Sequence, residues 1–395
     1  MSTQQELLAR YEASLLNVFG TPPLVITHGD GCHVWDADGR RYLDLLGGIA
    51  VNVLGHGHPA LVSAVSKQAG EVIHISNVFT SRQQIELAEQ LLGVAAAPPG
   101  SRVFFGNSGA EAIEAGIKLA RRTGRTGIVA AQGAFHGRTT GALALTHKEA
   151  YRAPFAPLIP GVSHVPFGDI DALAAAVTTD TGAVILEPVQ GEAGVIVADA
   201  DYLRAAREIT SAAGALLILD EIQSGIGRTG RWFAHQHSGV VPDAITVAKG
   251  LGGGVPIGAL LTFGAQVSGL LQPGQHGSTF GGNPLASAAG LAVLQTIEQD
   301  GLLANAERLG HHLADRLSTG GIPGVTGSRG VGLLQAITLA EPIAPAVALA
   351  ARHAGFIVNP VAPHALRIAP PLILTTDQLD EFIDALPDIV REAAS

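Results

Sequence analysis

The stretch ALLILDEIQSG, residues 215–225, decides the fold class, because an apolar run passes directly into a carboxylate at Asp220. A second stretch of the same kind, AITVAKG at residues 244–250, passes into the amine of Lys249. Short continuous apolar runs are typical of strands that are buried on both faces of a sheet. In open α/β sheets, ligands bind outside the carboxyl ends of the strands, so both charged side chains are expected at a ligand site.

The same pattern extends outward from these stretches, from about residue 59 to residue 300. Strands are expected at Arg102–Phe105, Gly127–Ala131, Ala183–Leu186, Ala215–Leu219, Ala244–Val247 and Ile257–Thr262. Helices are expected between several of them, at 109–122, 169–178 and 200–213. Strands that alternate with helices predict an α/β fold with a mostly parallel central sheet that is covered on both faces.

The two ends of the chain differ from this middle part. A short amphipathic helix is expected within residues 1–20, followed by a hairpin around the Asp38-Gly39 turn with arms at 33–36 and 41–45. After Asp300, helices are expected at about 301–318, 344–354 and 375–392, and strands at about 331–339 and 366–369. We therefore expect a large α/β domain (59–300) and a smaller α+β domain, which the C-terminal segment (301–395) forms with the N-terminal segment (1–58).

Composition excludes some classes of protein. The net charge is −10 over 395 residues, so no nucleic-acid partner is expected, because phosphate backbones are bound by basic surfaces. Cys32 is the only cysteine, so an intrachain disulfide is excluded, which fits the cytoplasm. The residue is expected to be a small buried apolar side chain.

Neither a signal peptide nor a membrane span is expected. Residues 250–297 contain no Asp, Glu, Lys or Arg, but prolines and glycines interrupt them, which indicates backbone buried near an active site and a subunit interface.

The stretch GNSGAEA, residues 106–112, has the pattern of an anion site. It follows a strand and opens a helix, with Ser108 as the expected N-cap and Glu111 as its capping-box partner. The free N–H groups of a helix N-terminus bind anions, and Gly109 would let a phosphate approach the backbone closely. An ordinary capped helix would have the same pattern.

Asp220 and Lys249 carry the second half of the chemistry. A buried carboxylate needs a cationic partner, which a protonated ring nitrogen would supply; a metal ion or a helix cap are the alternatives. A lysine in an apolar place is expected to have a lowered pKa, which suits imine formation. The glycines after Lys249 do not form a dinucleotide-binding motif, because Pro256 and another apolar strand follow where a helix should begin.

Seven segments in this order and spacing resemble the class-III (fold-type-I) pyridoxal-phosphate aminotransferases. They are SGAEA (108–112), FHGR (135–138), EPVQGE (187–192), DEIQSGIGRTG (220–230), AKGLGGG (248–254), STFGGNP (278–284) and LRIAPPL (366–372). The resemblance covers essentially the whole chain. It implies the fold of that family, an aminotransferase activity and pyridoxal 5'-phosphate as the cofactor.

The resemblance also implies how the cofactor would be held. Lys249 would carry it as a Schiff base and shuttle a proton, and Asp220 would keep its ring nitrogen protonated. Ser108, Gly109 and Ala110 would contact the phosphate. Phe135 would cover the ring face, and Gln223 would contact the ring hydroxyl region. Thr279 would reach the phosphate from the neighbouring subunit, which implies a homodimer with shared active sites.

Two arginines bear on the substrate. Arg138 and Arg367 lie in segments that line the substrate pocket of the family, and two guanidinium groups fit the two carboxylates of 2-oxoglutarate and glutamate. By the same resemblance, Glu192 would pair with Arg367 when an ω-amino donor binds, and would swing away for glutamate. Arg138 would hold the α-carboxylate of the donor, with Ser278 close by.

The donor is indicated by resemblance alone. The chain length and the FGTPPLV segment (19–25) are similar to members of the family that use N2-acetyl-L-ornithine in arginine biosynthesis. Phe19 stands where members that use free ornithine carry a tyrosine. Succinylornithine, ornithine, 4-aminobutyrate and succinyl-diaminopimelate are alternative donors, and a pyridoxal-phosphate aminomutase is an alternative reaction.

Other chemistries have less support in the sequence. The histidines lack zinc-type spacing with further ligands, so no metal is expected. His136 is expected to shape the pocket beside Phe135. A serine hydrolase would need Gly-x-Ser-x-Gly, which the residues around Ser108 do not supply.

Overall fold

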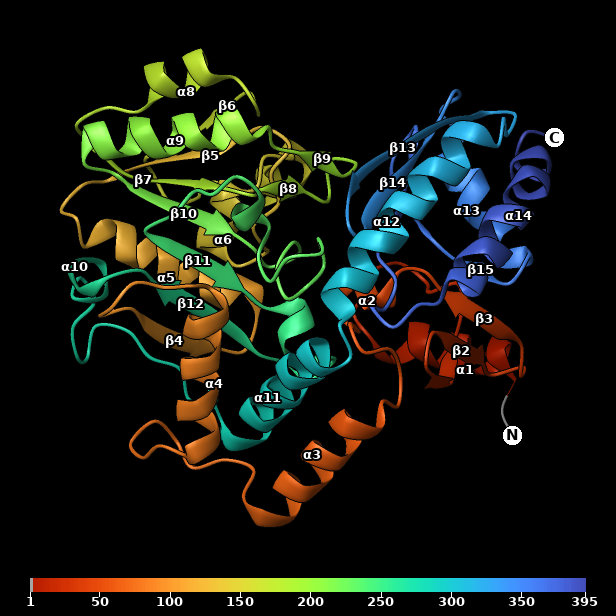
Figure 1. Ribbon diagram of the computed structural model, residues 1–395, viewed down its shortest axis with the longest axis horizontal. Coiled ribbons are helices and arrows are strands. Elements are labelled where there is room, and N and C mark those ends of the chain that lie inside the picture. Colours follow the sequence, from red (N-terminus) through yellow and green to blue (C-terminus); the bar gives the residue numbers. More distant parts are fainter. Residues whose placement is uncertain (1–2) are drawn as a thin grey trace.

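The computed structural model describes residues 3–395 and is built around one large sheet (Figure 1). Its seven strands lie in the order β4-β12-β11-β10-β7-β5-β6. They are β4 (Arg102–Gly106), β5 (Gly127–Ala131), β6 (Val162–Val165), β7 (Thr181–Leu186), β10 (Leu216–Asp220), β11 (Ala244–Val247) and β12 (Gly258–Thr262). Every neighbouring pair is parallel except those of β12, which is antiparallel to both β11 and β4. The predicted α/β fold with a mostly parallel sheet is confirmed.

Helices cover both faces of this sheet, as the continuous apolar strands require. On β10, Leu217 and Leu219 belong to one core cluster with Leu203, whereas Ile218 belongs to a second cluster with Ile113. Successive side chains of a strand point to opposite faces, so the two clusters mark the two sides of the sheet. The second cluster includes α5 (Gly109–Arg121) and α6 (Thr140–Leu145), and the first includes α8 (Ile170–Ala176) and α9 (Ala200–Ala213).

The two ends of the chain meet in a separate region, where the red and blue segments lie side by side in Figure 1. One small sheet pairs the hairpin strands with a short strand near the C-terminus, in the order β1 (Ile26–Asp30), β2 (His33–Asp36), β3 (Arg41–Asp44) and β15 (Phe356–Ile357). A second sheet has the order β13 (Val325–Val331), β14 (Leu334–Leu339), β17 (Ala365–Ile368) and β16 (Asn359–Ala362). The helices of this region are α12 (Leu302–Thr319), α13 (Ala344–His353) and α14 (Thr376–Ala393).

The remaining elements connect these regions. The helix α11 (Pro284–Gln299) packs against α3 (Pro59–Glu71), α4 (Arg82–Val94) and α12, and most of its residues are buried. The short elements are α1 (Gln4–Ser14), α2 (Gly47–Ala50), α7 (Glu149–Arg152), α10 (Ala265–Ser268), and the pair β8 (Val189–Gln190) and β9 (Ile196–Val197). Three 3-10 turns complete the described chain: η1 (Ala153–Phe155), η2 (Ala234–His237) and η3 (Lys249–Gly252).

Several expected elements differ from the structure. The strand expected at 331–339 is interrupted by a turn, because Gly332 has φ +56° and separates β13 from β14. The strands β6 and β16 and the helix α11 were not expected. Most of α11 lies in the charge-free stretch, where its nearly uniform apolar and small residues hide the helical periodicity. The N-terminal helix ends at Ser14, and its expected first two residues lie outside the described ones.

One smaller expectation is met. Cys32 is buried, and burial raises the pKa of its thiol to about 12. Among residues 3–395, every helix is too short or too polar to span a membrane.

Candidate active site

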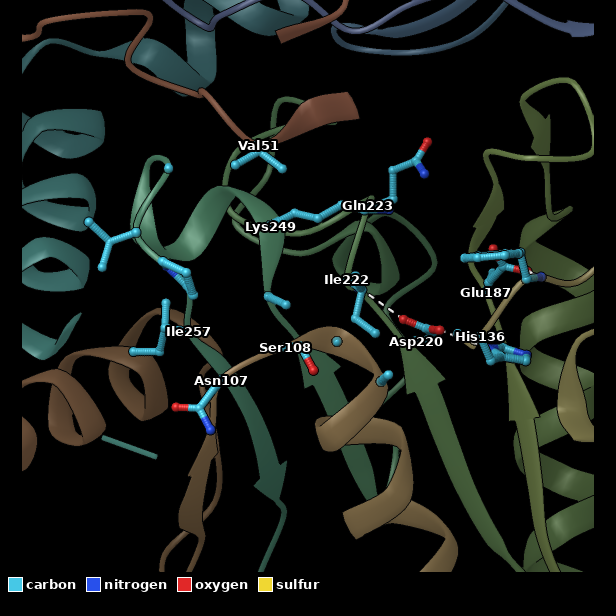
Figure 2. Close-up of a pocket in the computed structure, with 18 of the residues that line it drawn as sticks. Val51, Asn107, Ser108, His136, Glu187, Asp220, Ile222, Gln223, Lys249 and Ile257 are labelled. Atoms are coloured by element: carbon cyan, nitrogen blue, oxygen red, sulfur yellow. Dashed lines mark hydrogen bonds and ion pairs between the residues drawn. The ribbon is translucent and has the colours of Figure 1, made fainter. Parts of the chain in front are cut away.

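A cavity of about 350 Å³ lies at the carboxyl ends of β10 and β11. Asp220 is the last residue of β10 and lies opposite Thr246 of β11, and Lys249 lies two residues beyond the end of β11. Figure 2 shows Lys249, Asp220 and Ser108 around this cavity. The structure thus brings the two strand ends and the start of α5 together, and its lining also includes Gly109, Ala110, Phe135, His136, Glu187, Ile222 and Gln223.

Asp220 is buried at the rim of the sheet and held by three neighbours. Its Oδ1 accepts hydrogen bonds from Ile222 N (3.0 Å) and Thr246 Oγ1 (3.2 Å), and its Oδ2 lies 2.7 Å from His136 Nδ1. Burial lowers the pKa of His136, but the hydrogen bond to Asp220 and the charge of Asp220 together raise this pKa by more, so the net shift is upward. The sequence reasoning gave His136 a role in pocket shape only; it is in fact the direct ion-pair partner of Asp220.

Lys249 begins the turn η3 directly after β11, with φ +39°. Such a backbone angle is unfavourable for a residue with a Cβ atom, and it is typical of residues whose placement serves a site. Burial lowers the pKa of Lys249, and the charge of Glu192 opposes this shift only in part. A larger fraction of neutral amine follows, and the neutral amine is the form that reacts with a carbonyl.

Glu187 follows β7 and is a second buried carboxyl group on the cavity. Its Oε2 accepts a hydrogen bond from Phe135 N at 3.2 Å. Burial raises the pKa of Glu187 to about 8, although the charge of His136 opposes the shift. It stands first in the EPVQGE segment, so the motif contained the signal, but its burial beside Asp220 could not be predicted from spacing.

Arg367 is fully buried on β17 and faces three partners. Its Nη1 donates to Glu192 Oε1 (2.5 Å) and to Gln223 Oε1 (3.0 Å), and its Nη2 donates to Asn359 Oδ1 (2.7 Å). The Arg367 side chain is 1% exposed and that of Glu192 is 38% exposed. Burial raises the pKa of Glu192, but Arg367 lowers it more, so the carboxylate is favoured. The ion pair implied by the resemblance is therefore present, whereas the Asn359 contact was not anticipated.

The start of α5 is capped in part as expected. Ser108 Oγ accepts a hydrogen bond from Glu111 N at 3.2 Å, but the Glu111 carboxylate turns to Asn107 and does not close the capping box. A Cβ atom on Gly109 would lie 2.8 Å from Ile222 Cδ1, so close packing of α5 against this side chain already requires glycine there. Glu111 N is thus taken by the cap, and the N–H groups of Gly109 and Ala110 before it have no acceptor within the helix, which leaves them for a ligand.

Five predicted residues do not line the cavity: the Glu192–Arg367 pair, which reaches it through Gln223, and three residues that lie elsewhere. Arg138 is exposed, and its Cζ lies 3.6 Å from the centroid of the Tyr151 ring. Ser278 Oγ accepts hydrogen bonds from Asn107 Nδ2 (3.1 Å) and Gly281 N (3.0 Å), close to the start of α5. Thr279 is exposed at the surface of the chain.

The set of groups on the cavity fits pyridoxal phosphate. An amine, a buried carboxylate and a helix N-terminus can bind an aldehyde, a protonated ring nitrogen and a phosphate, respectively. Asp220 already pairs with His136, and its carboxylate also lines the cavity, where it can accept a hydrogen bond from a protonated ring nitrogen. The α/β fold and the groups on this cavity are therefore compatible with a phosphorylated carbonyl cofactor.

The chain belongs to the class-III aminotransferases, because its residues 17–390 match the family model described as aminotransferase class-III. It is therefore an aminotransferase, and the family implies pyridoxal phosphate as its cofactor.

Similar proteins support this assignment. The acetylornithine aminotransferase of Mycolicibacterium smegmatis is 56% identical over 98% of this chain and 99% of its own length. That of Streptomyces coelicolor is 52% identical over 99% and 97%. A solved ornithine aminotransferase from Toxoplasma gondii, with pyridoxal phosphate partly occupying its active site, has a TM-score of 0.93 at 31% identity and covers 100% of this chain and 97% of its own.

Proposed function

We propose that this aminotransferase moves the δ-amino group of N2-acetyl-L-ornithine to 2-oxoglutarate and yields N-acetyl-L-glutamate 5-semialdehyde and L-glutamate, a step of arginine biosynthesis. The relatives from Mycolicibacterium smegmatis and Streptomyces coelicolor bear the name of this activity at 56% and 52% identity over nearly the whole chain.

One observation carries the proposal: a fully buried arginine is paired with a partly exposed carboxylate beside the reactive lysine. Glutamate brings an α-carboxylate to the reacting end of the site, and Arg367 would bind it after Glu192 leaves. Acetylornithine brings no carboxylate to that end, and Arg367 would then keep Glu192 as its partner. A buried arginine without any partner would cost about 3–5 kcal/mol, so the pair lets one site accept both substrates.

The cofactor-binding residues follow from the same cavity. The bound cofactor would supply an electron sink for the substrate carbon that loses a proton. Lys249 Nζ would attach to it covalently and then carry the proton from that carbon, and Asp220 would hold a proton on the ring nitrogen. Phe135 would cover the ring face, and Gln223 would contact the ring hydroxyl region while it also bonds Arg367. Ser108, Gly109 and Ala110 would bind the phosphate.

Arg138 and Ser278 would bind the other end of the substrate. Both substrates carry a carboxylate there: the γ-carboxylate of glutamate and the α-carboxylate of acetylornithine. A guanidinium at that position would serve both half-reactions without an exchange of partners.

We further infer a homodimer in which Thr279 completes the phosphate site of the partner subunit. The support is local: Thr279 is exposed next to Phe280, and exposed Val78 and Phe79 lie on the neighbouring loop, which Asn77 Nδ2 joins to Ser278 O at 2.9 Å. Large apolar side chains grouped at a surface indicate a protein interface.

We also propose that the chain divides into the segments 1–58, 59–300 and 301–395. The support is that β3 of the N-terminal segment pairs with β15 of the C-terminal segment.

Half-reaction kinetics test the donor. The holoenzyme is mixed with acetylornithine, succinylornithine, ornithine or 4-aminobutyrate, and the visible absorbance of the bound cofactor is followed. We expect the largest kcat/KM for acetylornithine. A preference for free ornithine, the substrate named for the Toxoplasma gondii structure, would overturn the proposed donor and leave the aminotransferase assignment intact.

A further inference from the structure

Arg138 is held near the cavity-lining Phe135 in a different way from Arg367. Within residues 3–395 Arg138 forms no ion pair with Asp or Glu, and its Cζ lies 3.6 Å from the ring centroid of Tyr151 on α7. The same atom lies 5.5 Å from the ring centroid of Phe135, which lines the cavity. An arginine this close to a ring face forms a cation–π contact, which orders the side chain.

The ring of Tyr151 is itself fixed relative to the cavity. It meets the Phe135 ring edge-on, with centroids 6.4 Å apart and an interplanar angle of 85°. This is a favourable geometry for two aromatic rings. Aromatic contacts therefore connect Phe135 on the cavity wall through Tyr151 to Arg138. Lys148 Nζ also lies 4.7 Å from the Tyr151 centroid, so the ring contacts two cationic side chains.

We propose that Tyr151 is a positioning residue that holds Arg138 ready for the distal carboxylate common to both substrates. This inference rests on the proposed function. An aromatic ring orders a guanidinium without occupying its N–H donors, so no partner has to leave when the carboxylate binds. A carboxylate partner would instead compete with the substrate, as Glu192 does at Arg367. Arg367, whose substrate carboxylate is present in only one half-reaction, is thus paired with the carboxylate of Glu192. Arg138, which would bind a carboxylate in both half-reactions, is held by the ring of Tyr151.

The test compares donors with and without the distal carboxylate. N2-acetylornithine is matched with N-acetyl-1,4-diaminobutane, which has the same chain but no carboxylate. Tyr151→Leu is expected to lower kcat/KM for acetylornithine about three- to tenfold, mainly through KM, as fits the loss of one cation–π contact. The carboxylate-free donor should be unaffected, and Tyr151→Phe should keep wild-type values because it keeps the ring. Phe155→Leu is the matched control, since Phe155 is 65% exposed in the adjacent turn η1.

A binding measurement removes the dependence on turnover. Glutarate is titrated into the holoenzyme by calorimetry, with Phe155→Leu as the control variant. Tyr151→Leu should weaken glutarate binding by the same factor as the kcat/KM of acetylornithine, and Phe155→Leu should leave glutarate binding unchanged. In an Arg138→Ala background, Tyr151→Leu should have no further effect, because the two residues act as one unit.

Each outcome decides the question. Equal losses for both donors, or an additive effect in the Arg138→Ala background, would assign Tyr151 a merely structural role and overturn the inference. Unchanged glutarate binding in Tyr151→Leu would do the same. If the wild-type enzyme does not use acetylornithine at all, the proposed donor is wrong, while the glutarate measurement still tests Tyr151.

Discussion

Replacing Glu192 by glutamine isolates the exchange of partners that Arg367 has to make. Glutamine keeps the size of the side chain and removes its charge. Arg367 would retain two neutral acceptors, Gln223 Oε1 at 3.0 Å and Asn359 Oδ1 at 2.7 Å. The guanidinium would then be hydrogen-bonded but without a countercharge in the absence of glutamate. The substrate carboxylate of glutamate would no longer compete with Glu192, whereas acetylornithine would meet an uncompensated positive charge.

The size of the effect follows from the geometry of the pair. Two unit charges about 4 Å apart interact by about 4 kcal/mol at an effective dielectric constant of about 20. The 38% exposure of Glu192 screens this interaction. A charge-assisted hydrogen bond of about 1.5–3 kcal/mol is therefore the appropriate estimate. Since about 1.4 kcal/mol is a factor of ten, the ratio of kcat/KM for glutamate to kcat/KM for acetylornithine should rise about ten- to hundredfold in Glu192→Gln.

The two half-reactions are measured separately in a stopped-flow instrument, by the visible absorbance of the bound cofactor. Glu341→Gln provides the control, because Glu341 is exposed in the turn after β14 and forms none of the ion pairs described above. An unchanged ratio, with both half-reactions slowed by one common factor, would refute the exchange of partners at Arg367 and leave Glu192 as a structural residue.

Three further predictions test the rest of the site. Lys249→Ala should remove the visible absorbance of covalently held cofactor and lower turnover at least about 10²–10⁴-fold, the usual contribution of a positioned proton carrier; a variant that kept both would place the attachment elsewhere. A carboxyl whose folded-state pKa is raised stabilises the fold fully below its ordinary pKa of 4.5, and this stability is lost as the pH rises toward about 8. The melting temperature of cofactor-free protein should therefore fall over that range more steeply in the wild type than in Glu187→Gln, and equal slopes would contradict the raised pKa. Mixing Lys249→Ala with Thr279→Ala subunits should restore up to roughly a quarter of wild-type activity, because random pairing gives half mixed dimers with one intact site each; no rescue in demonstrably mixed dimers would exclude a shared phosphate site.

The strands and the ligand edge of the sheet could be predicted from short stretches of sequence. Leu216–Asp220 and Ala244–Val247 form strands within one residue of the expected bounds. A short run that is apolar throughout is stable as a strand that is buried on both faces of a sheet. The helix that starts at Gly109 was equally local, since Ser108 caps it from the preceding residue. By contrast, α11 was not recognised, because its first eleven residues are apolar or small and mostly buried, so a polar face marks only its C-terminal part.

Contacts between residues that are distant along the chain could not be predicted from local sequence patterns. His136 and Asp220 are 84 positions apart and meet at 2.7 Å only because β5 and β10 lie on either side of β7 in the sheet. Arg367 and Glu192, 175 positions apart, could be paired in advance only through the resemblance to a known family. Tyr151 had no signal at all, because a surface tyrosine after Lys148 has no distinguishing spacing.

The amino-acid sequence by itself determined that Asp220 and Lys249 stand at the ends of buried strands and that a capped helix begins at Ser108. Those features depend on the nearest neighbours along the chain, where propensity and hydrophobic period act. Only the tertiary structure decided which groups surround them: the His136 partner of Asp220, the Asn359 partner of Arg367 and the aromatic ring beneath Arg138. The physical reason is that strand order and loop paths place residues from remote parts of the chain within hydrogen-bonding distance, and local sequence does not encode strand order.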